Sequence, residues 1–466
     1  MPQYKITTDL FQLPYENNIS ILYAPLKGFL CKVNNDFIEL LANIETLNGA
    51  QLTPEIQRLV DYLIQAEIIN APPEPARQEP RSGPEISPTK LALFPTNQCN
   101  LKCRYCYAGA GEFAPKVMDW EIATSAIEYF LGQMHRQNWT TFPLEFHGGG
   151  EPFYAWHLLQ RIVSFAEEQC ARYGFKLEVY AATNGILNER QLEWVTAHFT
   201  SLTVSFDGLP HVQDYHRPLP NNQGSFQRVD QTLHYFDEHN FPYGIRCTVS
   251  QYNQDLLEET VNFVRQNYRT KLLFLEPVNI CGAHATNTAI LQPDLYKFIE
   301  NFKKLEPACA ASGLRLAYSG AQFEKISPNF CYVGTDDFAV TPDGFLTNCW
   351  EVTSQEHPLV ETFIFGKMLP DGKIQIDQAK LDFLRRLSVH QLDYCRDCFA
   401  RWHCAGDCVT RLGHQHYQGP RGGIRCETNR ELIKHCLIQM LERQDFYEPV
   451  QGEDCKNRVN IPPQSL

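Results

Sequence analysis

The chain has 466 residues, of which 43% are hydrophobic and 20% charged, so it can bury a substantial core and bulk disorder is not expected. Its net charge of −13 disfavours nucleic acid, because an acidic protein repels phosphates, and favours a basic peptide as partner. The first residues lack a signal pattern, and no apolar run approaches the roughly 18 residues of a membrane span. We therefore expect a cytoplasmic protein with no membrane partner.

Residues 1–70 predict a small α+β module. Apolar residues over 4–35 predict extended strands with a turn at "APLKG", and helical patterns follow over 35–47 and 53–69. Residues 71–90 are rich in proline and charge, a composition that suits neither helix nor strand. They predict a flexible linker.

Residues 91–300 alternate strand-like runs with helical patterns, which is typical of a parallel sheet wrapped by helices. The expected fold class is α/β, as a closed or partly closed barrel whose functional residues follow the strands. A bridging segment (301–330), a cysteine-rich, loop-rich domain (331–445) and a C-terminal tail (446–466) complete the predicted organisation.

The sequence contains 17 cysteines, which in a large cytosolic chain hold metal or iron–sulfur clusters more often than disulfides. Cys99, Cys103 and Cys106 directly follow the first predicted strand of the barrel in a CxxxCxxC arrangement. Three thiolates from one loop can bind three irons of a cubane and leave the fourth iron open for a substrate or cofactor. A chance cluster or a partial zinc site is the alternative.

The aromatic Tyr105 completes the pattern CxxxCxΦC, which resembles the loop of the radical S-adenosylmethionine (SAM) enzymes. This resemblance implies a 4Fe–4S cluster whose open iron binds SAM, within a partial (β/α)6 TIM-like barrel. It also implies reductive cleavage of SAM to methionine and a 5′-deoxyadenosyl radical.

Further motifs at the ends of later strands extend this resemblance. "HGGGEP" matches the family's GGEP motif, in which Glu151 can accept a hydrogen bond from the SAM amine. By resemblance, "ATNG" and "SFDG" contact the ribose, and the arginine of "IRCTVS" meets the SAM carboxylate. The residues expected at the cofactor are Tyr105, Gly149, Gly150, Glu151, Thr183, Asn184, Ser205, Asp207 and Arg246.

The segment after Asp207 resembles the DGxxxxHDxxR pattern of one radical SAM subgroup. It contains His211, His216 and Arg217. We interpret these three residues first as structural or loop residues, and only second as substrate contacts.

A second cysteine series is spaced CX12GX4C, then CX2CX5CX3C, then a last cysteine. This series resembles the seven-cysteine SPASM pattern, which implies two auxiliary 4Fe–4S clusters. By resemblance, the outer cluster is held by Cys395, Cys398, Cys404 and Cys426, and the inner cluster by Cys331, Cys349 and Cys408.

The sequence leaves several candidates for the fourth ligand of the inner cluster. Where related enzymes usually carry a cysteine, this sequence has Lys325. Either Cys309 or Cys281 reaches in from farther upstream, or one iron is open and could bind substrate directly.

Two assignments compete within this group. In sulfatase-maturing enzymes an aspartate used as a base follows the cysteine equivalent to Cys349. Here Trp350 fills that place and Glu351, the candidate catalytic residue, comes next, which weakens the sulfatase-maturase assignment. The N-terminal module instead resembles winged-helix, PqqD-like leader-recognition domains, whose sheet edge or groove can capture an extended peptide.

The expected function is a radical SAM/SPASM maturase that abstracts hydrogen from a precursor peptide and forms a cross-link or rearrangement. The expected partners are that peptide, an electron donor such as a flavodoxin or ferredoxin, and an accessory leader-binding protein. The alternatives are a formylglycine-forming sulfatase maturase, and a non-catalytic iron–sulfur carrier or leader-binding paralogue. The intact cysteine loop, with its GGE motif and Arg246, argues against the last two roles.

Overall fold

The computed structural model describes residues 4–46, 52–72, 83, 85–110, 113–278, 291–411 and 423–443. The predicted C-terminal tail, most of the predicted linker and Cys281 lie outside these residues. Among the described helices, none combines the length and the apolar character that crossing a membrane requires.

The N-terminal module is a three-stranded antiparallel sheet followed by two helices, as the sequence patterns predict. The strands pair in the order β1-β2-β3. Helix α1 begins where the Asn34 side chain accepts a hydrogen bond from the amide of Phe37, and Thr53 caps α2 in the same way. The elements are β1 (Phe11–Glu16), β2 (Ile19–Ala24), β3 (Phe29–Asn34), α1 (Asn35–Asn43) and α2 (Pro54–Gln65).

The centre of the molecule is an 11-stranded sheet in which β4 to β10 are parallel neighbours in chain order. The strands are β4 (Leu91–Leu93), β5 (Thr141–Phe146), β6 (Lys176–Thr183), β7 (Ser201–Ser205), β8 (Tyr243–Val249), β9 (Leu272–Pro277) and β10 (Arg315–Ala317). The helices are α3 (Trp120–Arg136), α4 (Trp156–Tyr173), α5 (Glu189–His198), α6 (Pro210–His216), α7 (Phe226–Glu238), α8 (Leu257–Asn267) and α9 (Leu295–Ala311). This alternation confirms the predicted α/β class.

The cysteine-rich region continues the same sheet. Strand β11 (Phe338–Val340) pairs parallel with β4, and β12 (Phe345–Thr347), β13 (Ile364–Met368) and β14 (Ile374–Ile376) follow antiparallel. Its helices are α10 (Val360–Phe363), α11 (Gln378–Arg385), α12 (Arg401–Cys404) and α13 (Gly423–Arg443). Because β11 pairs directly with β4, the second cysteine series is joined to the strand that leads into the first cysteine loop.

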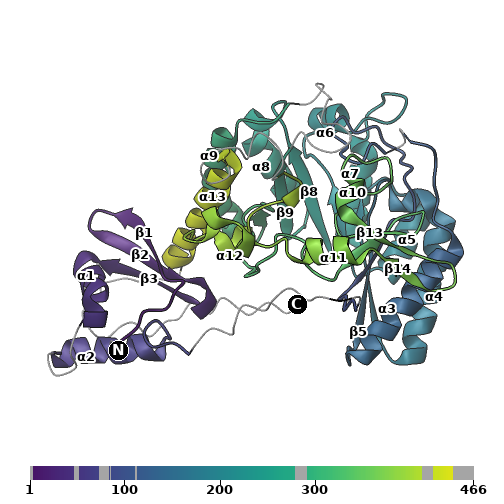
Figure 1. The fold of residues 1–466 in the computed structure, drawn as a ribbon. Helices are drawn as coiled ribbons and strands as arrows, with labels where there is room; N and C mark the ends of the chain where they lie inside the picture. The colour runs from purple at the N-terminus through teal and green to yellow at the C-terminus, as the bar shows by residue number, and fades with distance from the viewer. Residues whose placement is uncertain are drawn as a thin grey trace.

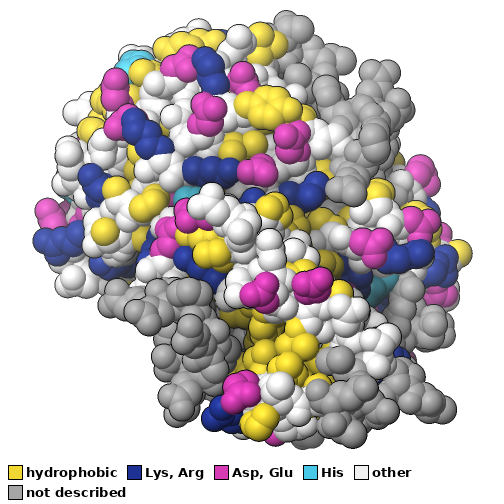
Figure 2. All heavy atoms as spheres, turned by 90° about the vertical axis from the view of Figure 1, so that its left-hand side faces the viewer, with side chains coloured by type: hydrophobic (Ala, Val, Ile, Leu, Met, Phe, Trp, Pro, Cys, Tyr) yellow, Lys and Arg dark blue, Asp and Glu magenta, His cyan; other side chains and the backbone are white. Residues whose placement is uncertain are grey.

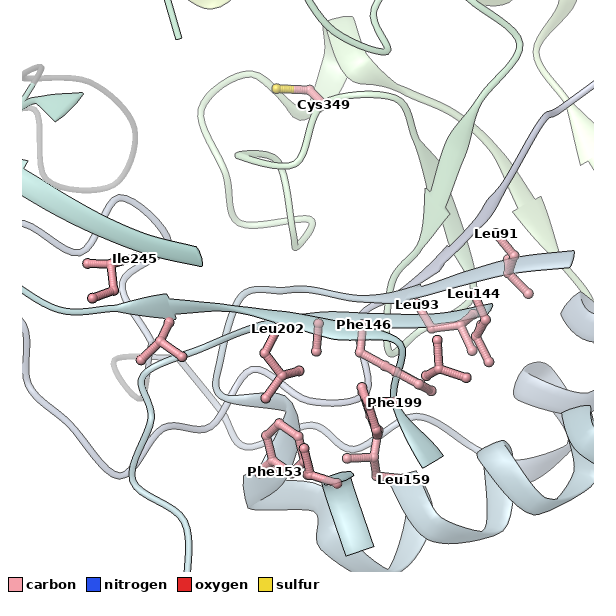
Figure 3. Packing of buried hydrophobic residues seen from close by; sticks show 14 of the residues in the cluster. Leu91, Leu93, Leu144, Phe146, Phe153, Leu159, Phe199, Leu202, Ile245 and Cys349 are labelled. Atoms are coloured by element: carbon pink, nitrogen blue, oxygen red, sulfur yellow. The ribbon is translucent and has the colours of Figure 1, made fainter. Parts of the chain in front are cut away.

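The two faces of the central sheet have different surroundings. Along β5, alternate side chains such as Phe146 are fully buried and belong to the main hydrophobic cluster with Leu159 of α4. Figure 3 shows Phe146 directed toward Leu159, whereas Cys349 lies on the opposite side of the strands. The helices therefore cover one face, and the loop that carries Cys349 lies over the other.

The N-terminal module packs directly against the C-terminal region. Tyr23 and Leu30 of its sheet share a buried cluster with Phe399 and with Leu437 of α13. Figure 1 shows α13 between the module and α9. The sequence predicts a module placed by a flexible tether, and this buried contact differs from that expectation because it gives the module a fixed position.

Polar contacts reinforce the same interface. The Tyr23 hydroxyl forms a buried hydrogen bond with Nε2 of His403, and Nε1 of Trp402 donates to Oδ2 of Asp9 at 3.1 Å. The Asp9 carboxylate also lies 3.5 Å from the Arg401 guanidinium. Buried polar groups need such partners, so these bonds favour one orientation of the module.

We expect Leu437→Ala to loosen the module. Leu437 is 0% exposed, and removing a buried leucine side chain costs about 2–5 kcal/mol. Hydrogen exchange of the β2 amides should become faster. Leu291→Ala, the same change at a residue that is 48% exposed, is the control and should leave this exchange unchanged. Unaltered β2 protection in Leu437→Ala would contradict a fixed module.

Candidate functional site

The first cysteine loop follows β4 at the carboxyl edge of the parallel strands. The carbonyl of Gln98 accepts a hydrogen bond from the amide of Glu151 at 2.8 Å, which ties the loop to the segment after β5. Two N–H groups point at the Cys99 sulfur, from the Leu101 amide at 3.4 Å and from Asn184 Nδ2 at 3.6 Å. Donors of this kind stabilise a thiolate, so Cys99 fits the role of a cluster ligand.

The electrostatics of the loop also fit a cationic cluster. Burial raises the pKa of Cys99 to about 12, and it raises the pKa of Cys103 as well. Without a cation these thiols stay neutral, whereas bound iron would ionise them. Within the described ranges, no group of three or more His, Cys, Asp or Glu side chains is arranged to hold a single metal ion. A cubane differs from a single ion because each of its thiolates binds a different iron.

Glu151, Thr183 and Asn184 meet beside this loop. The Glu151 carboxylate is 3% exposed and accepts hydrogen bonds from Thr183 Oγ1 at 2.8 Å and from the Asn184 amide at 2.7 Å. Burial raises the pKa of Glu151 to about 7, although these bonds act in the opposite direction. The Thr183 hydroxyl donates to this carboxylate, so it positions Glu151, and its contact with a ribose stays a prediction.

Ser205 and Arg246 are expected ligand contacts that remain at least partly accessible. They are register partners on β7 and β8. The Arg246 side chain is 47% exposed, and its NH2 group lies 3.4 Å from Oε1 of Glu276. A guanidinium in this setting can bind a carboxylate, so the position of Arg246 is compatible with the predicted contact to the SAM carboxylate. That contact stays a prediction.

Asp207 does not fit the ribose contact predicted for it. It is 0% exposed, and its oxygens accept hydrogen bonds from Tyr105, His216, Arg217 and the Thr248 amide. Burial opposes its ionisation, but the Arg217 guanidinium and the His216 bond hold the pKa of Asp207 below its ordinary value. Its carboxylate is fully engaged. Asp207 is therefore a structural group, and the Tyr105 hydroxyl likewise points to it.

The second cysteine series forms two groups, and their members are those that the resemblance to the SPASM pattern implies. Electrostatic interactions link Cys331, Cys349 and Cys408 to one another. The other group is linked in the same way and contains Cys395, Cys398, Cys404 and Cys426. Binding of auxiliary clusters at these two groups stays a prediction.

The structure narrows the choice of fourth ligand for the inner group. Cys309 lies on α9 within the hydrophobic core at 1% exposure, and the charged groups that act on its thiol are Arg265 and Glu306. It therefore does not fit the predicted ligand role. Lys325, at the position where relatives have a cysteine, interacts with Cys331.

The candidate catalytic residue Glu351 lies beside the inner group. Thr410 donates to its Oε2 at 3.3 Å and also contacts the Cys408 sulfur at 3.0 Å. The other oxygen, Oε1, is buried and has no hydrogen-bond partner among the described residues. Trp350, which takes the place of the aspartate in sulfatase-maturing enzymes, stacks on Tyr332 with ring centroids 4.3 Å apart.

Tyr107 is a site residue that the sequence reasoning missed. It directly follows Cys106 and is 36% exposed. Cys106, Glu351, Arg246 and Cys349 all act electrostatically on its hydroxyl. It therefore lies between the first cysteine loop and the inner group, and only its position next to Cys106 could have indicated this.

Comparisons with known proteins agree with this geometry. Residues 93–264 match the Radical SAM superfamily model. The chain is 22% identical over 301 residues to the radical SAM cyclopropyl synthase TigE of Paramaledivibacter caminithermalis, which covers 56% of this chain and 61% of that protein. It is 21% identical over 351 residues to the serine-type anaerobic sulfatase-maturating enzyme of Klebsiella aerogenes, covering 72% and 83%.

A solved structure shares the fold. Native anSMEcpe, with bound AdoMet and the Cp18Cys peptide, superposes with a TM-score of 0.59 at 15% identity, over 76% of this chain and 99% of that chain. The chain spans less than two thirds of the length of several curated relatives, TigE included. The match over 93–264 covers β4 to α8 and includes the cysteine loop. The chain thus contains a radical SAM domain of the Radical SAM superfamily.

Proposed function

We propose that the protein is a radical SAM maturase that modifies a precursor peptide. The observation that carries this proposal is the meeting of the cysteine loop, Glu151 and Arg246 at one edge of the sheet, opposite Cys349 and Glu351. With cluster and SAM bound, one-electron reduction supplies a 5′-deoxyadenosyl radical that abstracts hydrogen from the substrate.

The residues of this edge can bind and orient SAM. Cys99, Cys103 and Cys106 would hold the cluster that the family implies. The Glu151 carboxylate can accept from the amine of SAM, and the Arg246 guanidinium can bind its carboxylate. Phe94 packs edge-on against Trp350, with centroids 6.2 Å apart, and these two apolar side chains can help to exclude water from the same edge.

The inner and outer cysteine groups are proposed to hold two auxiliary 4Fe–4S clusters, whose chemistry is one-electron transfer. Glu351, with one buried oxygen free, can take a proton from the substrate at the inner group. A flavodoxin or ferredoxin, acting from outside the chain, is the proposed electron source.

The N-terminal module is proposed to hold the leader part of the peptide. Both faces of β2 are covered, one by the module's own core and the other by the contact with α13. Only the outer edges of β1 and β3 pair with no further strand in the described chain. Pro14 in β1 lacks an N–H group, so β3 is the better edge for strand addition. On the side that carries the module, Figure 2 shows hydrophobic side chains at the surface.

The relatives support a peptide substrate and also keep a second candidate. TigE is named a radical SAM cyclopropyl synthase, and anSMEcpe was solved with a peptide. The sulfatase-maturating relative covers 72% of this chain, so formylglycine formation is the second candidate. Trp350 at the place of the base favours the first.

The reconstituted protein should cleave SAM. Incubated without oxygen with SAM and dithionite, we expect it to release 5′-deoxyadenosine, measured by chromatography and mass spectrometry. Cys103→Ala should release none, while Cys170→Ala, at a buried cysteine on α4 outside both series, should retain the product. A protein that binds iron yet leaves SAM intact would be an electron carrier or a leader-binding paralogue.

The substrate class is tested by mass change. A short peptide encoded beside the gene, co-expressed with the protein, should lose hydrogen mass in a Cys103-dependent way. Conversion of a sulfatase serine or cysteine to formylglycine, with no change in that peptide, would instead select the second candidate.

Gly150→Ala should prevent the first cysteine loop from binding its cluster. A Cβ atom there would lie 2.2 Å from the backbone oxygen of Gln98, which immediately precedes Cys99, so the cysteine loop must shift. We expect the iron absorbance and the bound iron to fall by the share of one cluster, while the iron proposed for the inner and outer groups stays. Gly132→Ala on α3 is the matched control, because the nearest atom is 3.9 Å away and alanine favours a helix by about 0.5–1 kcal/mol. Normal iron content in Gly150→Ala would contradict this close approach.

SAM binding should depend on the ionisation of Glu151, whose pKa burial raises to about 7. The carboxylate, not the acid, attracts the ammonium group of SAM, so affinity should rise as pH increases from about 6 to about 7.5. The SAM-free protein should lose stability as pH rises from about 4.5 to about 7, because the carboxyl group ionises in the unfolded chain over this range while its raised pKa keeps it neutral in the folded protein. In equilibrium binding measurements, Glu151→Gln should remove the pH dependence of SAM affinity. An unchanged pH dependence would count against this role of Glu151.

A further inference from the structure

The side chains of Asp207, His216 and Arg217 lie against the first cysteine loop, and the proposed function assigns no role to them. We infer that Arg217 is the charge that raises the reduction potential of the SAM-binding cluster, with Asp207 as its counter-charge. This inference deepens the proposed function and rests on it.

The backbone places Arg217 against Cys103. The amides on either side of Cys103, those of Lys102 and Arg104, donate to the carbonyls on either side of Arg217, those of Pro218 and His216. The two distances are 2.8 and 2.9 Å. The cysteine and the arginine therefore occupy corresponding positions in two hydrogen-bonded segments.

Tyr105 connects the loop to the charges. It stands between Cys103 and Cys106 in the chain, and its hydroxyl donates to Oδ2 of Asp207. The guanidinium carbon of Arg217 lies 5.1 Å from the centre of the tyrosine ring, and His216 meets the same ring edge-on at 5.2 Å. The aromatic position of the CxxxCxΦC loop thus rests directly on the charged pair.

Arg217 and Asp207 form a buried, two-point ion pair. Arg217 is 7% exposed and Asp207 is 0% exposed. Nε of Arg217 lies 3.0 Å from Oδ2 of Asp207, and NH2 lies 3.2 Å from Oδ1. Because solvent is excluded, each charge acts on its neighbours with little screening.

His216 fixes the orientation of this group. Its Nδ1 lies 3.1 Å from Oδ2 of Asp207, which can only accept, so Nδ1 carries the proton. Its Nε2 lies 2.9 Å from the hydroxyl of Ser250. These two contacts hold the ring in place beside the Asp207 carboxylate, and the inference concerns the charges of Arg217 and Asp207.

The sign of the effect follows from the charge of a reduced cluster. Reduction adds one negative charge, which a buried cation stabilises and a buried carboxylate opposes. Arg217 acts more strongly than Asp207 on the Cys103 sulfur. A purely structural clamp would lead to a different result: loss of either residue would reduce iron content without moving the potential in opposite directions.

The test uses the anaerobically reconstituted holoprotein and a redox titration followed by electron paramagnetic resonance. The SAM-binding cluster is identified as the signal that changes when SAM is added. We expect Arg217→Gln to move its midpoint potential to a more negative value, and Asp207→Asn to move it to a more positive one. Arg217→Lys keeps the charge and should stay close to the wild type.

Two further variants separate charge from packing. Tyr105→Phe removes the hydrogen bond to Asp207 and keeps both charges, so its potential should change less than in either charge variant. Arg385→Gln removes an equally buried arginine, paired with Asp336 at 2.8 Å, and should leave the SAM-responsive potential unchanged.

The outcomes are distinct. Shifts of the same sign in Arg217→Gln and Asp207→Asn, or no shift in either, would overturn the inference. If Arg217→Gln gives no SAM-responsive signal, Asp207→Asn and Arg217→Lys decide, and a negative shift or no shift in Asp207→Asn would reject the inference. If no signal of the wild-type protein responds to SAM, the proposed function itself fails.

Discussion

The interaction on which the site depends is the burial of cysteine thiols at the carboxyl edge of a parallel sheet. A buried thiol resists ionisation, so Cys99 and Cys103 can become thiolates only beside positive charge. That requirement explains the surroundings of the loop. N–H donors point at Cys99, and a buried arginine lies against Cys103. The protein thus supplies part of the positive charge that these thiolates need, and a bound cationic group would supply the rest.

A second consequence of burial is that distant parts of the chain become fixed to one another. His403 directly precedes Cys404 of the outer group, and its Nδ1 donates to the carbonyl of Lys325 at 3.0 Å. Its other nitrogen accepts from Tyr23 of the N-terminal sheet. Because Lys325 also interacts with Cys331, one neutral imidazole connects the module with both cysteine groups. A peptide held at the module would therefore lie at a constant distance from the site.

Most of the architecture could be predicted because its signals are local. Strand and helix periods depend on neighbouring residues, so β4 to β9 follow from the sequence. The intervals between cysteines are also local, and their resemblance to a known pattern implied the members of both cysteine groups. Side-chain roles depend on what lies across the fold. Thr183 and Asp207 suit a ribose by residue type, yet each is engaged by a buried partner distant in sequence. The position of Cys309 likewise follows from the packing of α9, which spacing cannot reveal.

Two of the cysteine groups have an arginine that acts on one of their thiols, and these two arginines differ in how their charge is balanced. Arg217 acts on Cys103 and is paired with Asp207 from the same domain. Arg401 acts on Cys395, and its carboxylate neighbour, at 3.5 Å, is Asp9 of the N-terminal module. The outer group therefore receives part of its electrostatic environment from the element proposed to bind the peptide. Since a charge pair separates when its two elements move apart, the position of the module and the charge at the outer group are physically linked.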